Sequence, residues 1–257
     1  MNNRWKDTML QKLNTATDKE VRSFHNKTVW INQENVMGEL SDDEINWVKQ
    51  NSGLNSSYLP ETYLDRVATV HDKELNNRGS IRKFQQVIIK YKTLSDVLNK
   101  SFGSNENGYS RRYPSAGALY TIVPILYNFL DSDDLSNGIY IYDSNNYDLL
   151  KVKDCSKDNQ HLVNAMTIGQ KNNSLPSPYA VGYALNINGS VAKYGIRGYR
   201  HGLIEVGLMS QAFRESCLEC DLGEYCASAF DDLELTYESN LSVRDLPICL
   251  LQWFGVM

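Results

Sequence analysis

The sequence predicts a large α+β domain with a central sheet flanked by helices, preceded by an N-terminal extension. Apolar runs of strand length recur along the second half of the chain, and amphipathic helical patterns lie between them. Residues 1–75 are richer in Asn, Lys, Asp and Glu and are less periodic. With 257 residues, 42% of them hydrophobic, the chain can form one packed core. We therefore expect an extension over 1–75 and a domain over 76–257.

One helix is well marked within the extension. Ser41 and Glu44 are spaced as a capping box, Ile45 and Val48 are expected to face inward, and Gly53 lies beyond the end. This part of the chain could dock a partner, recognise a peptide or wrap around the core, and a solvated surface is the alternative.

The domain opens with a helix and continues mainly with strands. Thr93 and Asp96 predict a helix start, and Gly103 predicts its end. The side chains expected to face inward are those of Leu94, Val97 and Leu98. Strands are expected at "PILYNFL", "GIYIYD", "YDLLKV", "YAVGYALNI", "EYCASAF" and "PICLLQWFGV", of which the second and third form a hairpin. The longest helix is expected to follow Gly195 and to end at Gly223.

Composition excludes several classes of protein. A net charge of −5 is unlike that of nucleic-acid binders. The longest apolar stretch is shorter than the roughly 20 residues that span a bilayer, and the start lacks a secretory pattern. We expect a soluble cytoplasmic protein with reduced cysteines and no membrane or nucleic-acid partner.

No metal site is expected. Cys217 and Cys220 form a C-x-x-C inside a helical pattern, which favours packing over metal binding. The four histidines lack ligand spacing, and His201 is expected at the solvent or at a helix end. Asp231, followed by Asp232, is expected to begin a helix.

The segment "RGSIRKF" could bind a phosphate. Arg78, Ser80 and Arg82 alternate, so they face one side of an extended chain. Guanidinium groups bind phosphate in bidentate fashion, and the hydroxyl adds a donor. A solvated basic edge is the alternative, and it is favoured on this motif alone.

The segment "RRYPSAGALY" could support a flat ring. Pro114 restricts the backbone, Ser115 is expected to cap a short helix, and Ala116, Gly117 and Ala118 keep side chains small. Amides at a helix start suit an electron-rich edge. An ordinary helix-start turn explains the pattern equally well.

The segment "AKYGIRGYRHGLIE" could supply a base. Lys193 and Tyr194 are adjacent, and an ammonium group stabilises a phenolate. Neighbours on a strand point to opposite faces, so both residues reach one site only if the backbone is irregular, which Gly195 allows. A strand-to-helix junction with surface cations is the alternative.

Taken in this order, the three segments resemble the nitroreductase-like flavoproteins, and most closely the thiazole/oxazole-forming peptide dehydrogenases of the SagB/McbC type. The resemblance covers about residues 76–256 and implies an FMN-binding α+β fold with a mixed or antiparallel sheet, usually a homodimer with flavin at the interface. It implies that Arg78, Ser80 and Arg82 hold the phosphate, the ribityl chain and the pyrimidine end. It also places the turn formed by Pro114, Ser115, Ala116 and Gly117 against the ring system.

The same resemblance implies that Lys193 and Tyr194 are catalytic and that Gln211 lies near the ring. Two departures stand out. Ala116 replaces a glycine that is common in the turn, and the K-x-R with which generic nitroreductases hold phosphate is missing after the last expected strand. The second departure favours the dehydrogenase branch.

The resulting hypothesis is a step in bacteriocin-type natural product biosynthesis. A YcaO-type cyclodehydratase forms a thiazoline or oxazoline on a ribosomal precursor peptide, and this protein oxidises the ring. Tyr194, helped by Lys193, removes the Cα proton, hydride passes to flavin N5, and dioxygen reoxidises the flavin. The alternatives are an NAD(P)H-dependent reductase of nitroaromatics or quinones, and a flavin-free scaffold subunit of a synthetase complex.

Overall fold

The computed structural model describes residues 15–29, 31, 41–51, 67, 79–105, 110–168 and 174–257. The chain forms two compact units, one made of residues 1–32 with 80–257 and the other of 33–79. The smaller unit contains helix α3 (Asp42–Gln50), which begins with the predicted capping box of Ser41 and Glu44. Ile45 and Val48 were expected to face inward, but neither is buried, and 49% of Val48 is exposed.

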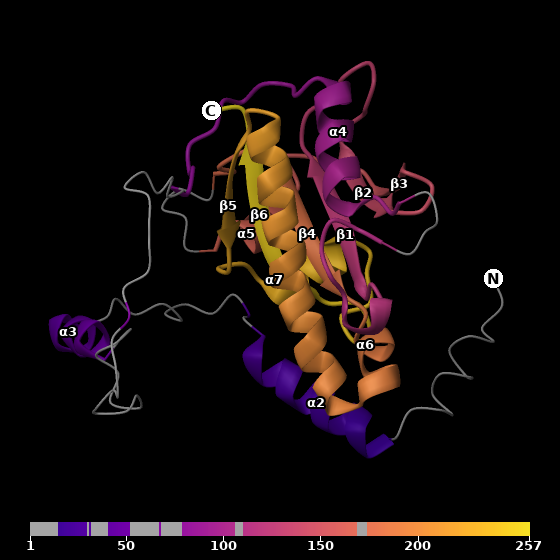
Figure 1. The fold of residues 1–257 in the computed structure, drawn as a ribbon. Helices are drawn as coiled ribbons and strands as arrows, with labels where there is room; N and C mark the ends of the chain where they lie inside the picture. Colours follow the sequence, from indigo (N-terminus) through magenta and orange to yellow (C-terminus); the bar gives the residue numbers. More distant parts are fainter. Residues whose placement is uncertain are drawn as a thin grey trace. The chain divides into compact units, whose positions relative to one another are not determined.

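The larger unit is built on a six-stranded sheet in which all neighbouring strands are antiparallel. Its strands are β1 (Ile122–Asn128), β2 (Gly138–Asp143), β3 (Asp148–Lys153), β4 (Tyr179–Leu185), β5 (Gly223–Ala227) and β6 (Ile248–Gly255). They follow the order β3-β2-β1-β4-β6-β5 (Figure 1). Every strand predicted from the sequence is present, and the β2–β3 hairpin is confirmed.

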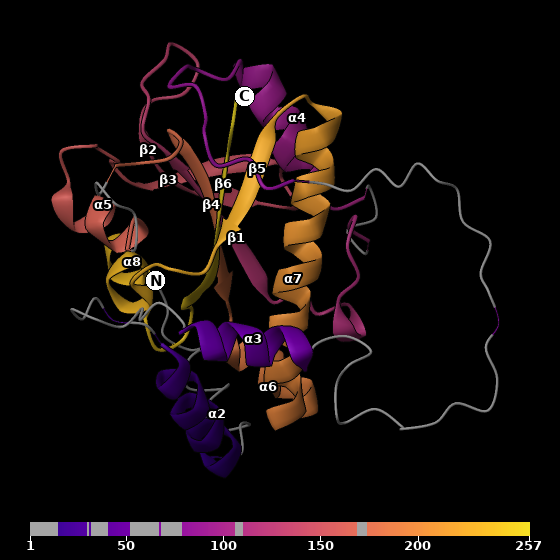
Figure 2. The same cartoon turned by 90° about the vertical axis from the view of Figure 1, so that its left-hand side faces the viewer.

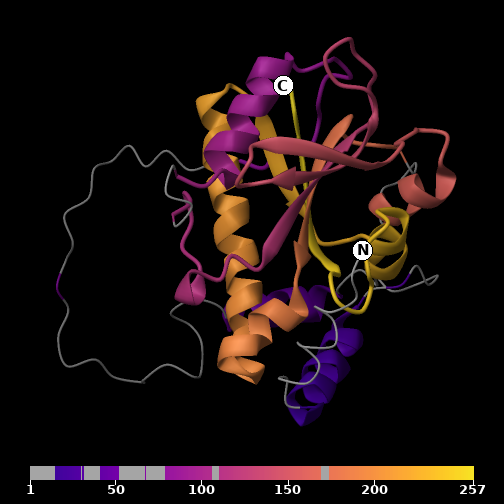
Figure 3. The same ribbon diagram turned by 90° about the vertical axis from the view of Figure 1, so that its right-hand side faces the viewer.

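Helices cover both faces of this sheet. The first face packs against α4 (Tyr91–Phe102) and α7 (Ile196–Glu219), and the second against α5 (Gln160–Met166) and α8 (Asp232–Glu238), as Figures 2 and 3 show. Because strand side chains alternate, Tyr183 and Phe254 join the first core while their neighbours Ala184 and Trp253 join the second. Among the described helices, none has the length and apolar character needed to cross a bilayer.

Helix boundaries differ from prediction at several points. Helix α4 begins at Tyr91, so Thr93 lies inside the helix instead of capping it, while Gly103 ends the helix as predicted. The expected inward residues Leu94, Val97 and Leu98 are buried. Helix α7 ends at Glu219, and Gly223 begins β5 instead of ending the helix.

Two local predictions near the C-terminal half are confirmed. Asp231 is the N-cap of α8, and its carboxylate accepts a hydrogen bond of 2.8 Å from the backbone N–H of Glu234. Cys217 is fully buried in the first core, and Cys220 is partly buried against it at the end of α7. Both thiols therefore contribute to packing.

A short helix that the sequence reading missed, α6 (Ile187–Tyr194), joins β4 to α7. Asn186 caps α6 by accepting a hydrogen bond from the backbone N–H of Gly189 at 2.8 Å. Gly195 adopts a φ of +56° and separates α6 from α7. Gly198 then allows close packing, because a Cβ there would overlap the carbonyl oxygen of Ser190. The chain thus reverses sharply directly after Lys193 and Tyr194.

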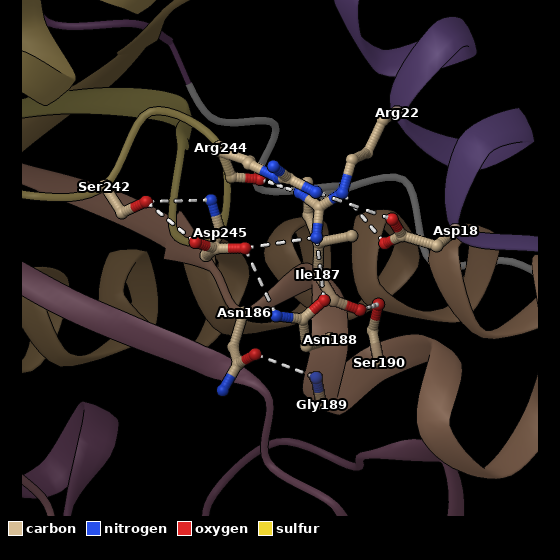
Figure 4. Close-up of polar contacts among 10 residues, drawn as sticks. All are labelled: Asp18, Arg22, Asn186, Ile187, Asn188, Gly189, Ser190, Ser242, Arg244 and Asp245. Atoms are coloured by element: carbon tan, nitrogen blue, oxygen red, sulfur yellow. Dashed lines mark hydrogen bonds and ion pairs between the residues drawn. The ribbon is translucent and has the colours of Figure 1, made fainter. Parts of the chain in front are cut away.

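Helix α2 (Thr15–Thr28) packs against α6 and α7 within the larger unit (Figure 1). The side chain of Arg22 anchors it. Arg22 bonds with Asp18 at 2.8 Å, Asn188 at 2.8 Å and Asp245 at 3.1 Å, and it also donates to the carbonyl of Arg244 (Figure 4). Part of the expected N-terminal extension therefore belongs to the same compact unit as the sheet.

Candidate functional site

The turn after Pro114 has an unusual backbone. A single turn of 3₁₀ helix spans Ala116–Ala118, and φ is positive at Gly117 (+66°), Ala118 (+54°) and Tyr120 (+47°). Glycine adopts this conformation freely, but alanine and tyrosine do so only when their surroundings impose it. Such strained backbone is frequent at functional sites. Contacts outside the turn must therefore hold it in place.

Ser115 supplies these contacts, in a different way from the one predicted. Its side chain makes no cap hydrogen bond to the 3₁₀ helix. Instead, its Oγ accepts the backbone N–H of Tyr120 at 2.9 Å and donates to Oε2 of Glu205 at 2.6 Å. Glu205 lies on α7 and is 3% exposed. The turn is therefore closed on itself and fastened to the long helix by one serine.

The two adjacent residues of the "KY" pair meet this turn at Gly117. A Cβ built on Gly117 would lie 2.6 Å from Oη of Tyr194 and 2.9 Å from Nζ of Lys193. The ammonium nitrogen of Lys193 lies 5.3 Å from the centre of the Tyr194 ring. Tyr194 is 37% exposed. An amine, a phenol and an exposed backbone turn therefore share one surface.

The expected local structure of this pair was wrong. Lys193 and Tyr194 are not at a strand-to-helix junction but form the last residues of α6. Successive residues of a helix are about 100° apart, so two neighbours can reach the same side without an irregular strand. Gly195 ends the helix beside them.

A small cavity lies beside Tyr194. His201 and Glu205, which were not predicted as site residues, also line it. It measures about 10 Å³ and is bordered by Tyr194, His201, Glu205 and Thr121 among others. The His201 ring meets the Tyr194 ring edge to face, with centres 5.4 Å apart. Glu205 carries a sequence signal, because it falls in phase with the buried positions of α7 where a charged residue is unexpected.

Burial shapes the electrostatics around Glu205. Burial raises the pKa of its carboxyl, and the hydrogen bond from Ser115 partly opposes this shift. The backbone amides of Ile122 and Thr121 and the charge of Arg111 act in the same direction as Ser115. Burial therefore favours the protonated form of this carboxyl more than in an exposed glutamate.

The two arginines before the turn have structural partners. Arg111 lies over the ring of Tyr120 at 4.4 Å and donates to Oη of Tyr113 at 3.0 Å. Arg112 pairs with Glu219 at 2.5 Å, and the hydrogen bond from Arg112 is the main cause that lowers the pKa of Glu219 to about 2. Arg111 therefore stabilises the segment internally, and Arg112 fastens it to α7.

The phosphate-binding candidates lie elsewhere. Arg78 falls outside the described residues. Ser80 and Arg82 are exposed, and the Arg82 guanidinium lies 5.5 Å from the centre of the Tyr225 ring. Between them, the backbone N–H of Ile81 bonds to the carbonyl of Glu224 at 3.2 Å. The segment is thus held beside β5, directly after the C-terminal end of α7.

The turn and the phosphate-binding candidates are therefore separated along α7. The turn is fastened at Glu205, in the N-terminal half of α7, whereas Ser80 and Arg82 lie near its C-terminal end. From Glu205 to Glu219 the helix rises roughly 21 Å. Gln211 lies between them, is exposed, and bonds with Arg214 and Glu215 at 3.2 Å each. The structure brings together the turn, Lys193 and Tyr194, but not the whole predicted set.

Comparison with known proteins gives relatives in sequence and in structure. No family model matches the chain. It is 26% identical over 171 residues to the microcin B17-processing protein McbC of Escherichia coli, a match that covers 65% of this chain and 62% of McbC. It is 25% identical over 177 residues to a Methanocaldococcus jannaschii protein named as a nitroreductase, covering 69% of this chain and 86% of that protein.

Solved structures extend the likeness to nearly the whole chain. A chain of the E. coli microcin synthetase McbBCD complex with truncated pro-MccB17 bound matches with a TM-score of 0.81 and 20% identity, over 97% of this chain and 96% of that one. A nitroreductase-type structure from Ralstonia eutropha matches with a TM-score of 0.58 and 20% identity, over 70% and 79% of the two chains.

Proposed function

The chain is a nitroreductase-like protein of the McbC/SagB type, and from this premise we propose that it is an FMN-dependent dehydrogenase. Its substrates would be thiazoline or oxazoline rings in a ribosomally made precursor peptide, and its products thiazoles or oxazoles. The likeness to McbC and to nitroreductases supports an oxidoreductase that takes part in microcin-type biosynthesis.

One observation carries this proposal. Nζ of Lys193 and Oη of Tyr194 converge on Gly117, the residue of the turn whose missing side chain leaves room for both. A phenol beside an ammonium is suited to accept a proton, because the positive charge favours the phenolate. Two surface residues without a functional role are not expected to converge on a strained glycine turn.

The residues present fit a flavin. The turn exposes its backbone at Gly117 and Ala118, which suits a flat ring, and Ser80 and Arg82 are exposed and suited to a phosphate. FMN, when bound, would supply the two-electron acceptor for the substrate hydride. Arg82 would hold the phosphate end, and Gln211 would lie near the ring.

We propose that two copies of the chain share each flavin site. The turn and the Ser80–Arg82 segment lie toward opposite ends of α7, so a two-fold axis near the middle of α7 would bring one copy's turn to the other copy's Arg82. The same helix presents exposed apolar side chains that a partner could cover. They are Ile196, Leu203, Ile204 and Leu208.

In the proposed reaction, the protein's residues orient the ring and move one proton. Tyr194, as the phenolate, takes the proton from the ring Cα, and Lys193 stabilises the phenolate before that transfer. The ring loses two electrons and two protons in total, the second proton leaving with the electron pair as hydride. Partial exposure of Tyr194 leaves room for a peptide to reach it.

The proposed partners follow from the same relatives. The McbBCD complex holds a precursor peptide together with its synthetase subunits. We propose that this chain likewise works on a precursor peptide beside a YcaO-type cyclodehydratase, which forms the azoline before oxidation.

Lys193→Ala and Tyr194→Phe test the reaction and the roles of both residues. Both variants should stay yellow with bound flavin but lose azole formation by about 100-fold or more, since a positioned base contributes that much. Azole is measured by mass spectrometry as a loss of two hydrogens from the azoline peptide. Tyr237→Phe, an exposed tyrosine on α8, is the matched control and should be fully active. Full turnover by both site variants would remove the assignment.

A second candidate function is an NAD(P)H-dependent reductase of nitroaromatics or quinones. The 25% identity to the M. jannaschii nitroreductase-named protein favours it. Rapid bleaching of the flavin by NADPH in the absence of peptide would support this reading over the dehydrogenase.

A further inference from the structure

Two buried oxygen atoms belong to residues that line the small cavity beside Tyr194. Oε1 of Glu205 and Oγ1 of Thr121 are fully buried and have no hydrogen-bond partner among the residues that the structure describes. Both residues border the same cavity of about 10 Å³. Buried polar atoms are nearly always satisfied, and a cavity of this size has room for one water molecule. Hydrogen-bond interactions with the backbone of Ile122 and Thr121 lower the pKa of this carboxyl, although neither amide meets the distance and angle limits of a full hydrogen bond to Oε1.

The other oxygen of Glu205 holds the catalytic turn. Oε2 accepts the Ser115 hydroxyl at 2.6 Å, and the same hydroxyl oxygen accepts the N–H of Tyr120 at 2.9 Å. The bond between Ser115 and Tyr120 closes the turn around Gly117 and Ala118, which with Tyr120 have positive φ. Without Glu205, the Ser115 hydroxyl would lose its acceptor and the turn would lose its link to α7.

We propose that Glu205, with one ordered water that it shares with Thr121, forms a buried brace that sets the position of Gly117 against Lys193 and Tyr194. Glu205 is thus a positioning residue for the proposed reaction, and this role rests on the proposed function. It acts by accepting hydrogen bonds. Its contact with the turn is the hydrogen bond from the Ser115 hydroxyl, so its proposed role is to position the turn and not to transfer the substrate proton.

An amide can replace such a carboxylate, but an alkyl group cannot. In Glu205→Gln the amide oxygen can accept from Ser115 and the NH₂ can donate to Thr121 or to the water. In Glu205→Leu the Ser115 hydroxyl, Thr121 Oγ1 and the water all lose their shared partner. Comparison of the two variants therefore separates the effect of lost hydrogen bonds from the effect of side-chain volume.

Azoline oxidation in the dimeric, flavin-loaded protein is the first measurement. We expect Glu205→Gln to keep kcat within about threefold of wild type with an unchanged pH profile, and Glu205→Leu to lose kcat by about tenfold or more at an unchanged KM. Glu238→Leu is the matched control, because Glu238 is also buried and accepts from Lys153 and Asn159 on the other face of the sheet. It should destabilise the protein without a selective loss of kcat. The proposal would be overturned if Glu205→Gln lost one limb of the pH profile of kcat. It would also be overturned if kcat fell equally in Glu205→Gln and Glu205→Leu.

Two further measurements do not need the reaction, so they decide the proposal even if no azole forms. Hydrogen exchange at the Tyr120 amide should speed up about tenfold or more in Glu205→Leu and stay near wild type in Glu205→Gln. A high-resolution crystal structure should place one water within hydrogen-bond distance of Glu205 and Thr121, and Thr121→Val should displace it. Unchanged exchange in Glu205→Leu, or a dry cavity in the wild type, would refute the brace.

Discussion

At the scale of single residues, the site depends on the absence of a side chain at Gly117. Gly117 has a left-handed backbone, and the atoms nearest to its missing Cβ are the ends of the Lys193 and Tyr194 side chains. Both ends are flexible, so an added methyl group would displace them and leave the core in place. The glycine therefore matters for the position of the pair as well as for the shape of the turn.

Gly117→Ala should separate function from stability. The positive φ costs roughly 1–2 kcal/mol of folding free energy, whereas displacement of the phenol by about 1 Å should lower azole formation about 100-fold. Thermal unfolding and turnover are measured on the same preparation. Asn240→Ala serves as a control, because Asn240 also has a positive φ (+58°) but follows α8, on the other face of the sheet. Activity that falls only in proportion to folded protein would contradict this explanation.

Sequence reasoning identified these residues but not how they meet. Lys193, Tyr194 and Gly117 were all chosen from local patterns, yet their contact joins segments about 76 residues apart along the chain. No local period encodes such a contact. Glu205 belongs to no motif, and its signal in the sequence is that a charged residue falls in phase with the buried positions of α7.

At the scale of elements, strands were predicted better than helix ends. Strand runs such as "YAVGYAL" are continuous and apolar because β4 lies at the centre of the sheet with both faces covered. Helix α6 was missed because its eight residues show little periodicity, although Asn186 is a favourable N-cap. The strand order depends on pairing between distant segments, which local sequence does not specify.

Helix α2 should make the stability of the larger unit depend on pH. His25 on α2 is buried, and its Nδ1 lies 2.8 Å from Oη of Tyr199 on α7. Burial lowers the pKa of His25, and the charge of Arg22 lowers it further. The unfolded chain therefore binds the proton more readily, so stability should be lost as the pH falls below about 6.5.

His25→Gln tests this prediction, because the amide can still bond with Tyr199 but does not titrate. Thermal midpoints are compared between pH 7.5 and pH 5.5 for both proteins. The wild type should lose more stability on acidification than the variant does, and amide exchange in α2 should report the same difference. Equal losses in the two proteins would show that His25 does not control the docking of α2.

At the scale of the whole molecule, the length of α7 separates the two parts of the proposed flavin site. Its 24 residues hold the turn near one end and lead directly into β5, where the Ser80–Arg82 segment is attached. In the proposed shared site, the two ends of the flavin lie against different copies of the chain. The apolar side chains of Leu203, Ile204 and Leu208, exposed along the same helix, are placed where a second copy would meet it.

Mixing two inactive variants distinguishes a shared site from a site within one copy. Arg82→Ala removes the proposed phosphate contact, and Tyr194→Phe removes the proposed base. If sites are shared across a two-fold axis, a mixed dimer has one site with both defects and one intact site. Random exchange of equal amounts should then restore about a quarter of the wild-type azole formation, because half of the dimers are mixed and each has one working site.

If each site lay within one copy, every site in the mixture would keep a defect and no activity would return. The exchange itself is checked by native mass spectrometry of differently tagged copies. Ile204→Asp in both partners provides the control for assembly, since a charge in the apolar contact should prevent pairing and abolish the recovery. Absence of recovery in copies that do exchange and pair would rule out the shared site, and it would require Ser80, Arg82 and the turn to be reached by one flavin within a single copy.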